Sequence, residues 1–219
     1  MRIDKGFSLV ELTLATFLGV LILTVMTSTY VFTIASSNSQ LKYSTLKSEL
    51  DSLLFLMANE VKRAGYCGNC TTSNGFMITD ISGDQSAIVI DDSATKASGT
   101  CIRFSYNHDS AENIVSVRDK DARGFRLFDS DKDGIDDFEV YTNYGGLANW
   151  GCGNTHTHWQ NYNNQMITIK ALSFDRSTYL SAVSGAVSSM QNIDITIQGQ
   201  LGSMLETRTI TVSVPNVDK

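Results

Sequence analysis

The apolar residues divide the chain into a charge-free first segment, a segment of helical period and a long region that approaches a period of two. From Leu12 to Leu41 there is no charged residue, a run of 30 positions. About 20 apolar residues are enough for a helix to cross a bilayer, and at membrane depth a helix is how a single segment satisfies its own backbone. The run therefore predicts a membrane-spanning helix that begins near Phe7.

After this run, apolar residues recur every three or four positions between charged ones. They are Leu46, Leu50, Leu53, Leu54, Met57 and Val61. This spacing predicts an amphipathic helix that continues the apolar one. Gly65 is suited to a left-handed C-cap, and Lys62 and Arg63 suit the negative end of the helix dipole. We therefore expect one helix over residues 7–64, roughly 85 Å long at 1.5 Å per residue.

Beyond Tyr66 the pattern changes to the alternation that is typical of strands. The segments that show it are 76–78, 87–90, 101–106, 114–118, 124–128, 138–141, 166–174, 192–198 and 207–214. The last two alternate apolar and polar residues without interruption, which predicts an antiparallel hairpin with one buried face. Such a sheet packed on the amphipathic half of the helix gives an α+β fold class.

Glu11 departs from the composition of an ordinary membrane anchor. It lies four residues inside the apolar segment, where an ionised carboxylate costs a few kcal/mol or more and is expected to have a partner. Cleavage between Gly6 and Phe7 would create an α-amino group one helical turn before Glu11, in the same helix or in a neighbouring one. A general secretory signal does not fit, because the cut would lie before the apolar run and the positive residues abut it.

The segment from Gly6 to Leu12 reads GFSLVEL and resembles the prepilin processing signal of type IV pilins and type II secretion pseudopilins. The resemblance implies that a prepilin peptidase cuts after Gly6 and methylates the new terminus at Phe7. It also implies that the apolar helix anchors the subunit in the inner membrane and later packs in a filament core, with Glu11 serving assembly. The alternative is an uncleaved signal anchor that carries a stray glutamate.

A second motif narrows the resemblance. Residues 57–67 read MANEVKRAGYC, similar to the helix end of PilW-type minor pilins. The resemblance implies a leader over 1–6, a membrane half of the helix over 7–41, an amphipathic half over 42–65 and a head over 66–219. It implies a structural subunit that joins other minor pilins to prime assembly or sit at the tip of an extracellular pilus. A type II secretion pseudopilin remains an alternative, as does an anchored head that binds DNA, a glycan or a host surface.

Residues 129–137, DSDKDGIDD, form the sharpest chemical motif. Carboxylates at alternate positions followed by Gly134 can wrap oxygen ligands around one hard cation, which predicts a Ca²⁺ site. Val140 stands where an EF-hand loop has its last glutamate, and the flanking segments are predicted strands. A solvated acidic turn is the alternative. The expected ligands are Asp129, Asp131, Asp133, the Ile135 carbonyl and Asp137.

Four cysteines follow the membrane segment: Cys67, Cys70, Cys101 and Cys152. An even number in an exported segment predicts two disulfides, with three pairings open. We favour Cys67–Cys70 with Cys101–Cys152. A redox motif at Cys67-x-x-Cys70 lacks the strand and helix that normally surround one. Zinc bound by Cys67, Cys70, Cys152 and the pair His156 and His158 is a further alternative.

Charge and composition limit the function classes. Loss of the leader takes Arg2, Asp4 and Lys5 and leaves 15 basic and 22 acidic side chains, which argues against non-specific DNA binding through a broad basic face. Residues 151–162 are polar and aromatic, and predict either a contact loop or a cover for a sheet edge. No evident nucleophile accompanies the histidines there, so no enzyme is predicted.

Overall fold

The structure is a computed structural model. It describes residues 8–68, 70, 74–112, 116–130, 132–142, 146–153, 158–162, 166–183 and 186–215, with side chains outside 178–190. Within these residues the chain forms one α-helix, two short 3₁₀ helices, η1 (Asp119–Asp121) and η2 (Leu147–Asn149), and 11 strands. The order of one long helix followed by antiparallel strands confirms the predicted α+β fold class.

The helix α1 (Leu9–Val61) contains both halves of the predicted helix. It contributes to two compact units, residues 1–45 and 46–219. In the first unit its large apolar side chains are exposed, as for Leu9, which is 78% exposed. In the second unit the predicted apolar stripe is buried. α1 ends at Val61 rather than at the predicted Ala64, because Arg63 N and Ala64 N donate to carbonyls three residues back instead of four. Gly65 follows this turn with a φ of +71°, the left-handed conformation predicted for it, and its N–H donates to the Ser105 carbonyl at 2.8 Å.

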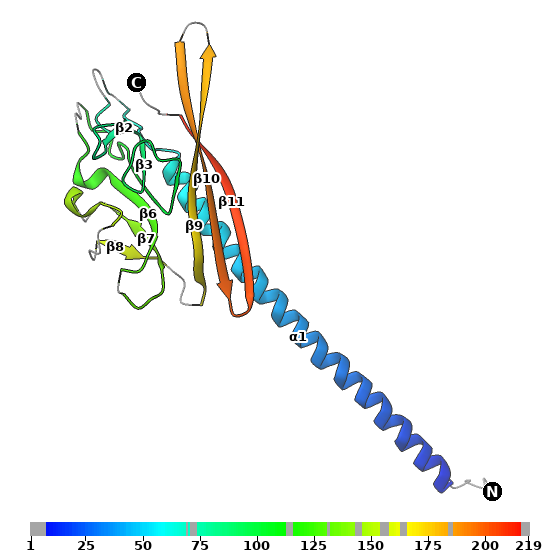
Figure 1. Ribbon diagram of the computed structural model, residues 1–219. Helices are drawn as coiled ribbons and strands as arrows, with labels where there is room; N and C mark the ends of the chain where they lie inside the picture. The colour runs from blue at the N-terminus through cyan, green and yellow to red at the C-terminus, as the bar shows by residue number, and fades with distance from the viewer. Residues whose placement is uncertain are drawn as a thin grey trace. The chain divides into compact units, whose positions relative to one another are not determined.

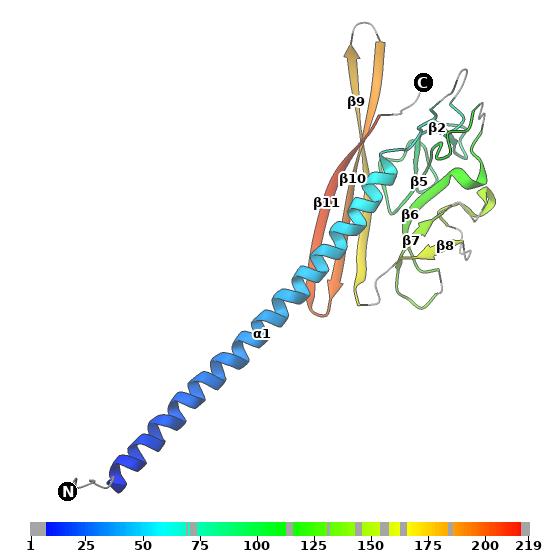
Figure 2. The same ribbon diagram turned by 180° about the vertical axis from the view of Figure 1, so that it is seen from behind.

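A four-stranded antiparallel sheet packs on the second part of α1. Its order is β11 (Met204–Val214), β10 (Ala186–Leu201), β9 (Thr168–Val183) and β4 (Ser98–Gly99). Residues 46–61 of α1 cross one face of this sheet (Figures 1 and 2). The helix comes so close to β10 that a Cβ at Gly199 would lie 2.8 Å from Leu50 Cδ2. The core between them includes Leu46, Leu50, Met57, Ile193, Ile195, Ile197, Val212 and Val214.

A five-stranded antiparallel sheet completes the core of the head. Its order is β3 (Ile88–Ile90), β5 (Cys101–Ser105), β6 (Ala122–Phe128), β7 (Asp137–Tyr141) and β8 (Trp159–Asn161). One face adds Phe104, Phe125 and Phe138 to the core that contains α1. The opposite face contacts a second cluster around Tyr141, Trp150 and Trp159. Both faces of this sheet are therefore partly covered.

The strand predictions differ from the structure in several respects. Phe76 and Met77 of the predicted 76–78 strand lie outside any strand, and β9 and β10 extend well beyond the predicted 166–174 and 192–198. Ser116, Val117 and Arg118 are not in a strand, and the rest of the predicted 114–118 strand lies outside the described residues. Strands β2 (Gln85–Ser86), which pairs with β1 (Ile78–Thr79), β4 and β8 were not predicted, because two or three residues are too few to establish a period. The strands divide into three sheets rather than one.

Candidate functional site

The first turn of α1 holds the Glu11 carboxylate against the helix backbone. Ser8 N donates to Glu11 Oε2 at 3.0 Å. The helix begins at Leu9, so the carboxylate accepts from one of the amides that a helix start leaves unpaired, at the positive end of the helix dipole. Gly6 and Phe7, the predicted processing site, lie outside the described residues. The sequence Ser8-x-x-Glu11 fits a capping box, a signal that predicts this contact and that sequence reasoning overlooked.

The hydroxyl groups in the apolar part of α1 bond to their own helix. Thr24 Oγ1 donates to the Val20 carbonyl at 2.8 Å, and Ser28 Oγ donates to the Thr24 carbonyl at 2.8 Å. Similar bonds are made by Thr27, Thr29 and Thr33. Such bonds satisfy polar groups where water is absent. In the described part of the chain α1 is the helix long and apolar enough to cross a membrane, which is compatible with membrane anchoring.

The acidic motif forms the connection between β6 and β7. Asp129 Oδ1 accepts from Asp133 N at 3.1 Å and Asp129 Oδ2 accepts from Gly134 N at 3.0 Å. The backbone of residues 129–134 therefore curves around the Asp129 carboxylate. Positive φ angles at Lys132 (+63°) and Gly134 (+86°) permit the tight course. Ile135 N donates to Asp133 Oδ1 at 2.8 Å. Two predicted carboxylates remain: Asp131 lies outside the described residues, and Asp137 is the first residue of β7, where it pairs with Phe128.

A buried ion pair lies beside this loop, on the face of the five-stranded sheet opposite α1. Arg126 on β6 and Glu139 on β7 are direct register partners, and Arg126 Nε lies 2.6 Å from Glu139 Oε2. Both side chains are almost completely buried, at 0% and 3% exposure. Burial lowers the pKa of Arg126 and Glu139 opposes this shift. The guanidinium lies 4.3 Å from the ring centroids of both Phe128 and Trp159.

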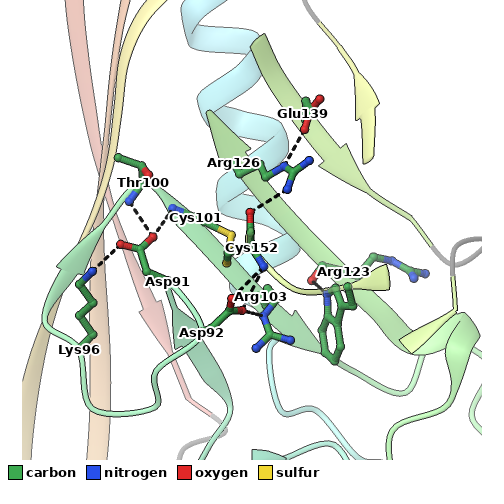
Figure 3. The surroundings of a disulfide bond; sticks show 11 residues. Asp91, Asp92, Lys96, Thr100, Cys101, Arg103, Arg123, Arg126, Glu139 and Cys152 are labelled. Carbon is green, nitrogen blue, oxygen red and sulfur yellow. Dashed lines mark hydrogen bonds and ion pairs between the residues drawn. A yellow bond between two sulfur atoms is a disulfide. The ribbon is translucent and has the colours of Figure 1, made fainter. Parts of the chain in front are cut away.

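Arg126 also connects the acidic loop to the segment around Cys152, and Figure 3 shows its contacts with Cys152 and Glu139. Its Nη2 donates to Ser130 Oγ at 2.9 Å, and its Nη1 donates to the Cys152 carbonyl at 2.7 Å. Cys152 N donates to both carboxylate oxygens of Asp92, at 3.1 and 3.0 Å, and Asp92 in turn lies 2.7 Å from Arg103 Nε. Local sequence gives no signal for Arg126, Glu139 or Asp92, because their contacts depend on strand register.

The structure contains two disulfides, Cys67–Cys70 and Cys101–Cys152, with Cα separations of 5.7 and 6.0 Å. All four cysteine sulfurs are therefore bonded, which leaves no cysteine thiolate for zinc. His156 lies outside the described residues, as does the rest of 154–157 in the predicted contact loop, whereas His158 is described and half-buried. The end of that loop, Trp159–Asn161, forms the edge strand β8.

Three residues near the end of η1, His108, Asp109 and Asp121, have the composition of a metal site. The two carboxylates already form ion pairs with the side chains of Arg118 and Lys120. Arg118 Nε lies 2.5 Å from Asp121 Oδ2 and Arg118 Nη2 lies 2.8 Å from Asp109 Oδ1, and Lys120 also contacts Asp109. These contacts, that of Arg118 above all, hold the pKa of Asp109 well below its usual range. The cluster is therefore an ion-pair network that fixes the turn before β6.

Comparison with known protein families places the chain. The model of the family described as Prepilin peptidase-dependent protein B matches residues 39–216, which include the amphipathic half of α1 and all but the last three residues of the head. The match does not include the processing motif at residues 6–12. The family match and the prepilin-like motif therefore indicate a pilin-like protein from different parts of the chain. No curated protein and no solved structure shows a significant match. The chain belongs to the prepilin peptidase-dependent protein B family, whose members are pilin-like structural proteins related to the type IV pilus.

Proposed function

We propose that this protein is a PilW-like minor pilin, a structural subunit of a type IV pilus that primes assembly or sits at the filament tip. The observation that carries the proposal is α1: an exposed apolar helix that holds a carboxylate in its first turn, attached to a head that matches a prepilin peptidase-dependent family. An ionised carboxylate destabilises the insertion of an anchor that stays in lipid by a few kcal/mol or more. It has a purpose in a helix that later leaves the bilayer and packs against other helices.

The proposed mechanism begins with cleavage after Gly6 and methylation of Phe7 in the inner membrane. Before assembly, Glu11 accepts from the Ser8 amide, as in the structure. On assembly its carboxylate pairs with the new amino terminus, of its own helix or of a neighbouring subunit, which compensates both charges as the helices leave the bilayer. The partners are other pilins and minor pilins, and detection in sheared surface filaments would separate a pilus subunit from a type II secretion pseudopilin.

Substitutions at Glu11 test this pairing. Glu11→Ala and Glu11→Gln should both leave the protein inserted and processed but reduce its incorporation into filaments about tenfold or more, the equivalent of about 1.4 kcal/mol. The measurement is the ratio of subunit in sheared filaments to subunit in membranes. The glutamine variant is informative because its amide oxygen still accepts from Ser8 N but carries no charge. Normal incorporation of Glu11→Gln would show that helix capping, and not the ion pair, is what assembly requires.

We also propose that the loop 129–137 binds Ca²⁺ through Asp129, Asp131, Asp133, the Ile135 carbonyl and Asp137. Support comes from the fold of the loop: Asp129 gathers two amides, and the positive φ of Gly134 gives the turn that a ligand loop needs. Bound Ca²⁺ would compensate carboxylates that otherwise repel one another and would hold the β6–β7 connection.

Calcium binding is testable by thermal unfolding. Ca²⁺ at 100 times its dissociation constant should stabilise the full chain by about 2.7 kcal/mol, whereas Mg²⁺ at that concentration should have little effect because the predicted ligand set suits the larger ion. Asp129→Asn and Asp133→Asn should abolish the shift. Asp136→Asn is the matched control, since Asp136 is exposed in the same loop and outside the predicted ligand set. If Ca²⁺ stabilised all three variants equally less than wild type, its effect would depend on the total charge of the loop and not on a ligand set.

A further inference from the structure

Strand β11 forms an open edge of the four-stranded sheet. The order β11-β10-β9-β4 gives it a neighbour on one side among the described residues. It pairs with β10 from Met204 to Val214 without a register shift, and Figure 1 shows it as the outer strand beside β10. At about 3.4 Å per residue its 11 residues give an edge of about 37 Å.

The turn between β10 and β11 decides which backbone groups face outward. Gly202 and Ser203 alone separate the paired residues Leu201 and Met204, and Gly202 has a φ of +62°, as a two-residue hairpin loop with glycine first requires. In such a hairpin the pair that flanks the loop is hydrogen-bonded, and bonded and non-bonded pairs then alternate. The outward N–H and C=O groups are therefore those of Leu205, Thr207, Thr209, Thr211 and Ser213.

The second half of this edge lacks the features that normally prevent edge pairing. Soluble proteins protect such edges with charges, proline or bulges. Residues 209–214 read TITVSV, without charge, proline or glycine, and five of the six are β-branched, a composition that favours strand pairing. Arg208 is the last charged residue of β11, and its side chain is directed to α1, where Arg208 Nε lies 2.8 Å from Asp51 Oδ1.

Side-chain hydroxyls along this half of the edge already bond to β10. Thr209 Oγ1 lies 2.9 Å from Thr196 Oγ1, and Thr211 Oγ1 donates to Asp194 Oδ1 at 2.5 Å. These bonds fix both threonines across the ladder. A partner that approaches this edge would therefore form its hydrogen bonds with the outward backbone N–H and C=O groups of β11, and not with the threonine hydroxyls.

We propose that residues 209–214 of β11 bind an extended, uncharged segment of another pilin-like subunit, which adds a strand to the four-stranded sheet. An extended backbone is the shape that matches N–H and C=O groups repeated along an edge. An edge without charge suits a segment without charge, because a charge buried there would be unpaired, and it does not suit nucleic acid, whose phosphates need cations. The inference rests on the proposed function, since assembly brings the heads of pilin-like subunits beside one another.

Two substitutions at one position test the proposal. Thr209→Pro removes an outward N–H and keeps the backbone hydrogen bonds between β11 and β10, because proline is tolerated where an edge strand's N–H faces away from the sheet. Thr209→Val is its matched control, since both variants lose the bond to Thr196 but valine keeps the N–H. Tagged full-length protein is purified from membranes of cells that produce the complete set of pilin-like subunits. Recovery of a second subunit with a prepilin-type leader in its gene should fall about tenfold for Thr209→Pro and less than twofold for Thr209→Val.

Recovery of that subunit at the wild-type level with Thr209→Pro would overturn the proposal and leave the proposed function intact. The proposal is also overturned if differently tagged copies show that the sole partner is a second copy of this chain. If wild-type protein recovers no pilin-like subunit at all, the proposed function itself fails.

Hydrogen exchange of the wild-type protein supplies a test that does not depend on how a variant folds. Amides of Thr209 and Thr211 should exchange at least tenfold more slowly in the complex than in the subunit produced alone. Amides of Arg208 and Ile210 should change little, because β10 already protects them. A uniform change across β11, or none, would contradict strand addition.

Discussion

Replacement of Glu139 by Ala is expected to lower the free energy of unfolding by about 3–5 kcal/mol, because it leaves the buried Arg126 guanidinium without its counter-charge. Arg126 is 0% exposed and pairs with Glu139 at 2.6 Å, so water cannot replace the carboxylate without opening the sheet. The measurement is denaturant unfolding of the full chain in detergent. It is followed by the fluorescence of Trp159, which stacks on Arg126, and of Trp150, which is buried in the same cluster as Trp159.

An exposed ion pair supplies the control for Glu139→Ala. Asp51 pairs with Arg208 between α1 and β11, with side chains 44% and 36% exposed, so Asp51→Ala should cost less than about 1 kcal/mol. The double variant Arg126→Met/Glu139→Leu should be more stable than Glu139→Ala, because it removes both buried charges together. A cost for Glu139→Ala no greater than that for Asp51→Ala would show that the buried pair does not hold the five-stranded sheet.

Removal of the Cys101–Cys152 disulfide should have an effect of similar size. The bond closes a loop across 51 positions of sequence, and the loss of chain entropy that it imposes on the unfolded state is worth about 4 kcal/mol. It also holds Cys152, whose backbone contacts both Asp92 and Arg126. The double variant Cys101→Ala/Cys152→Ala is compared with wild type by denaturant unfolding under oxidising conditions.

The second disulfide is the internal control. Cys67 and Cys70 are 3 positions apart, so the same entropic relation gives about 2 kcal/mol for Cys67→Ala/Cys70→Ala. Equal losses for the two double variants would mean that loop length does not decide their contribution. A negligible loss for the Cys101 and Cys152 pair would mean that the register of β5 and the ion pair hold Cys152 without the bond.

The parts of the fold that follow from a local period could be predicted from the sequence. Leu46, Leu50 and Met57 repeat at helical spacing, and all three are buried on α1. The alternation around Ile195 and Ile210 likewise predicted the β10–β11 hairpin, in which these two residues pair directly. In both cases the residues that define the period are also the residues that pack, so local pattern and tertiary structure agree.

The surroundings of Arg126 could not be predicted in this way. Alternation places Arg126 on the face opposite Phe125, which suggests a solvated position. That face is instead covered by the segment around Cys152, and the burial depends on pairings of Arg126 with both Cys101 and Glu139 across three strands. Register between strands distant in sequence is a tertiary property. The acidic loop, in contrast, is a contiguous motif, and its Ca²⁺ remains a prediction.

The central claim is that this chain is made as a prepilin and becomes a filament subunit once its leader is removed. Intact-mass analysis of the protein purified from its own membranes tests that claim most directly. The account predicts a polypeptide that begins at Phe7, carries one added methyl group and contains two disulfides. A mass that retains residues 1–6 would contradict it, because Glu11 would then have no new amino terminus to pair with.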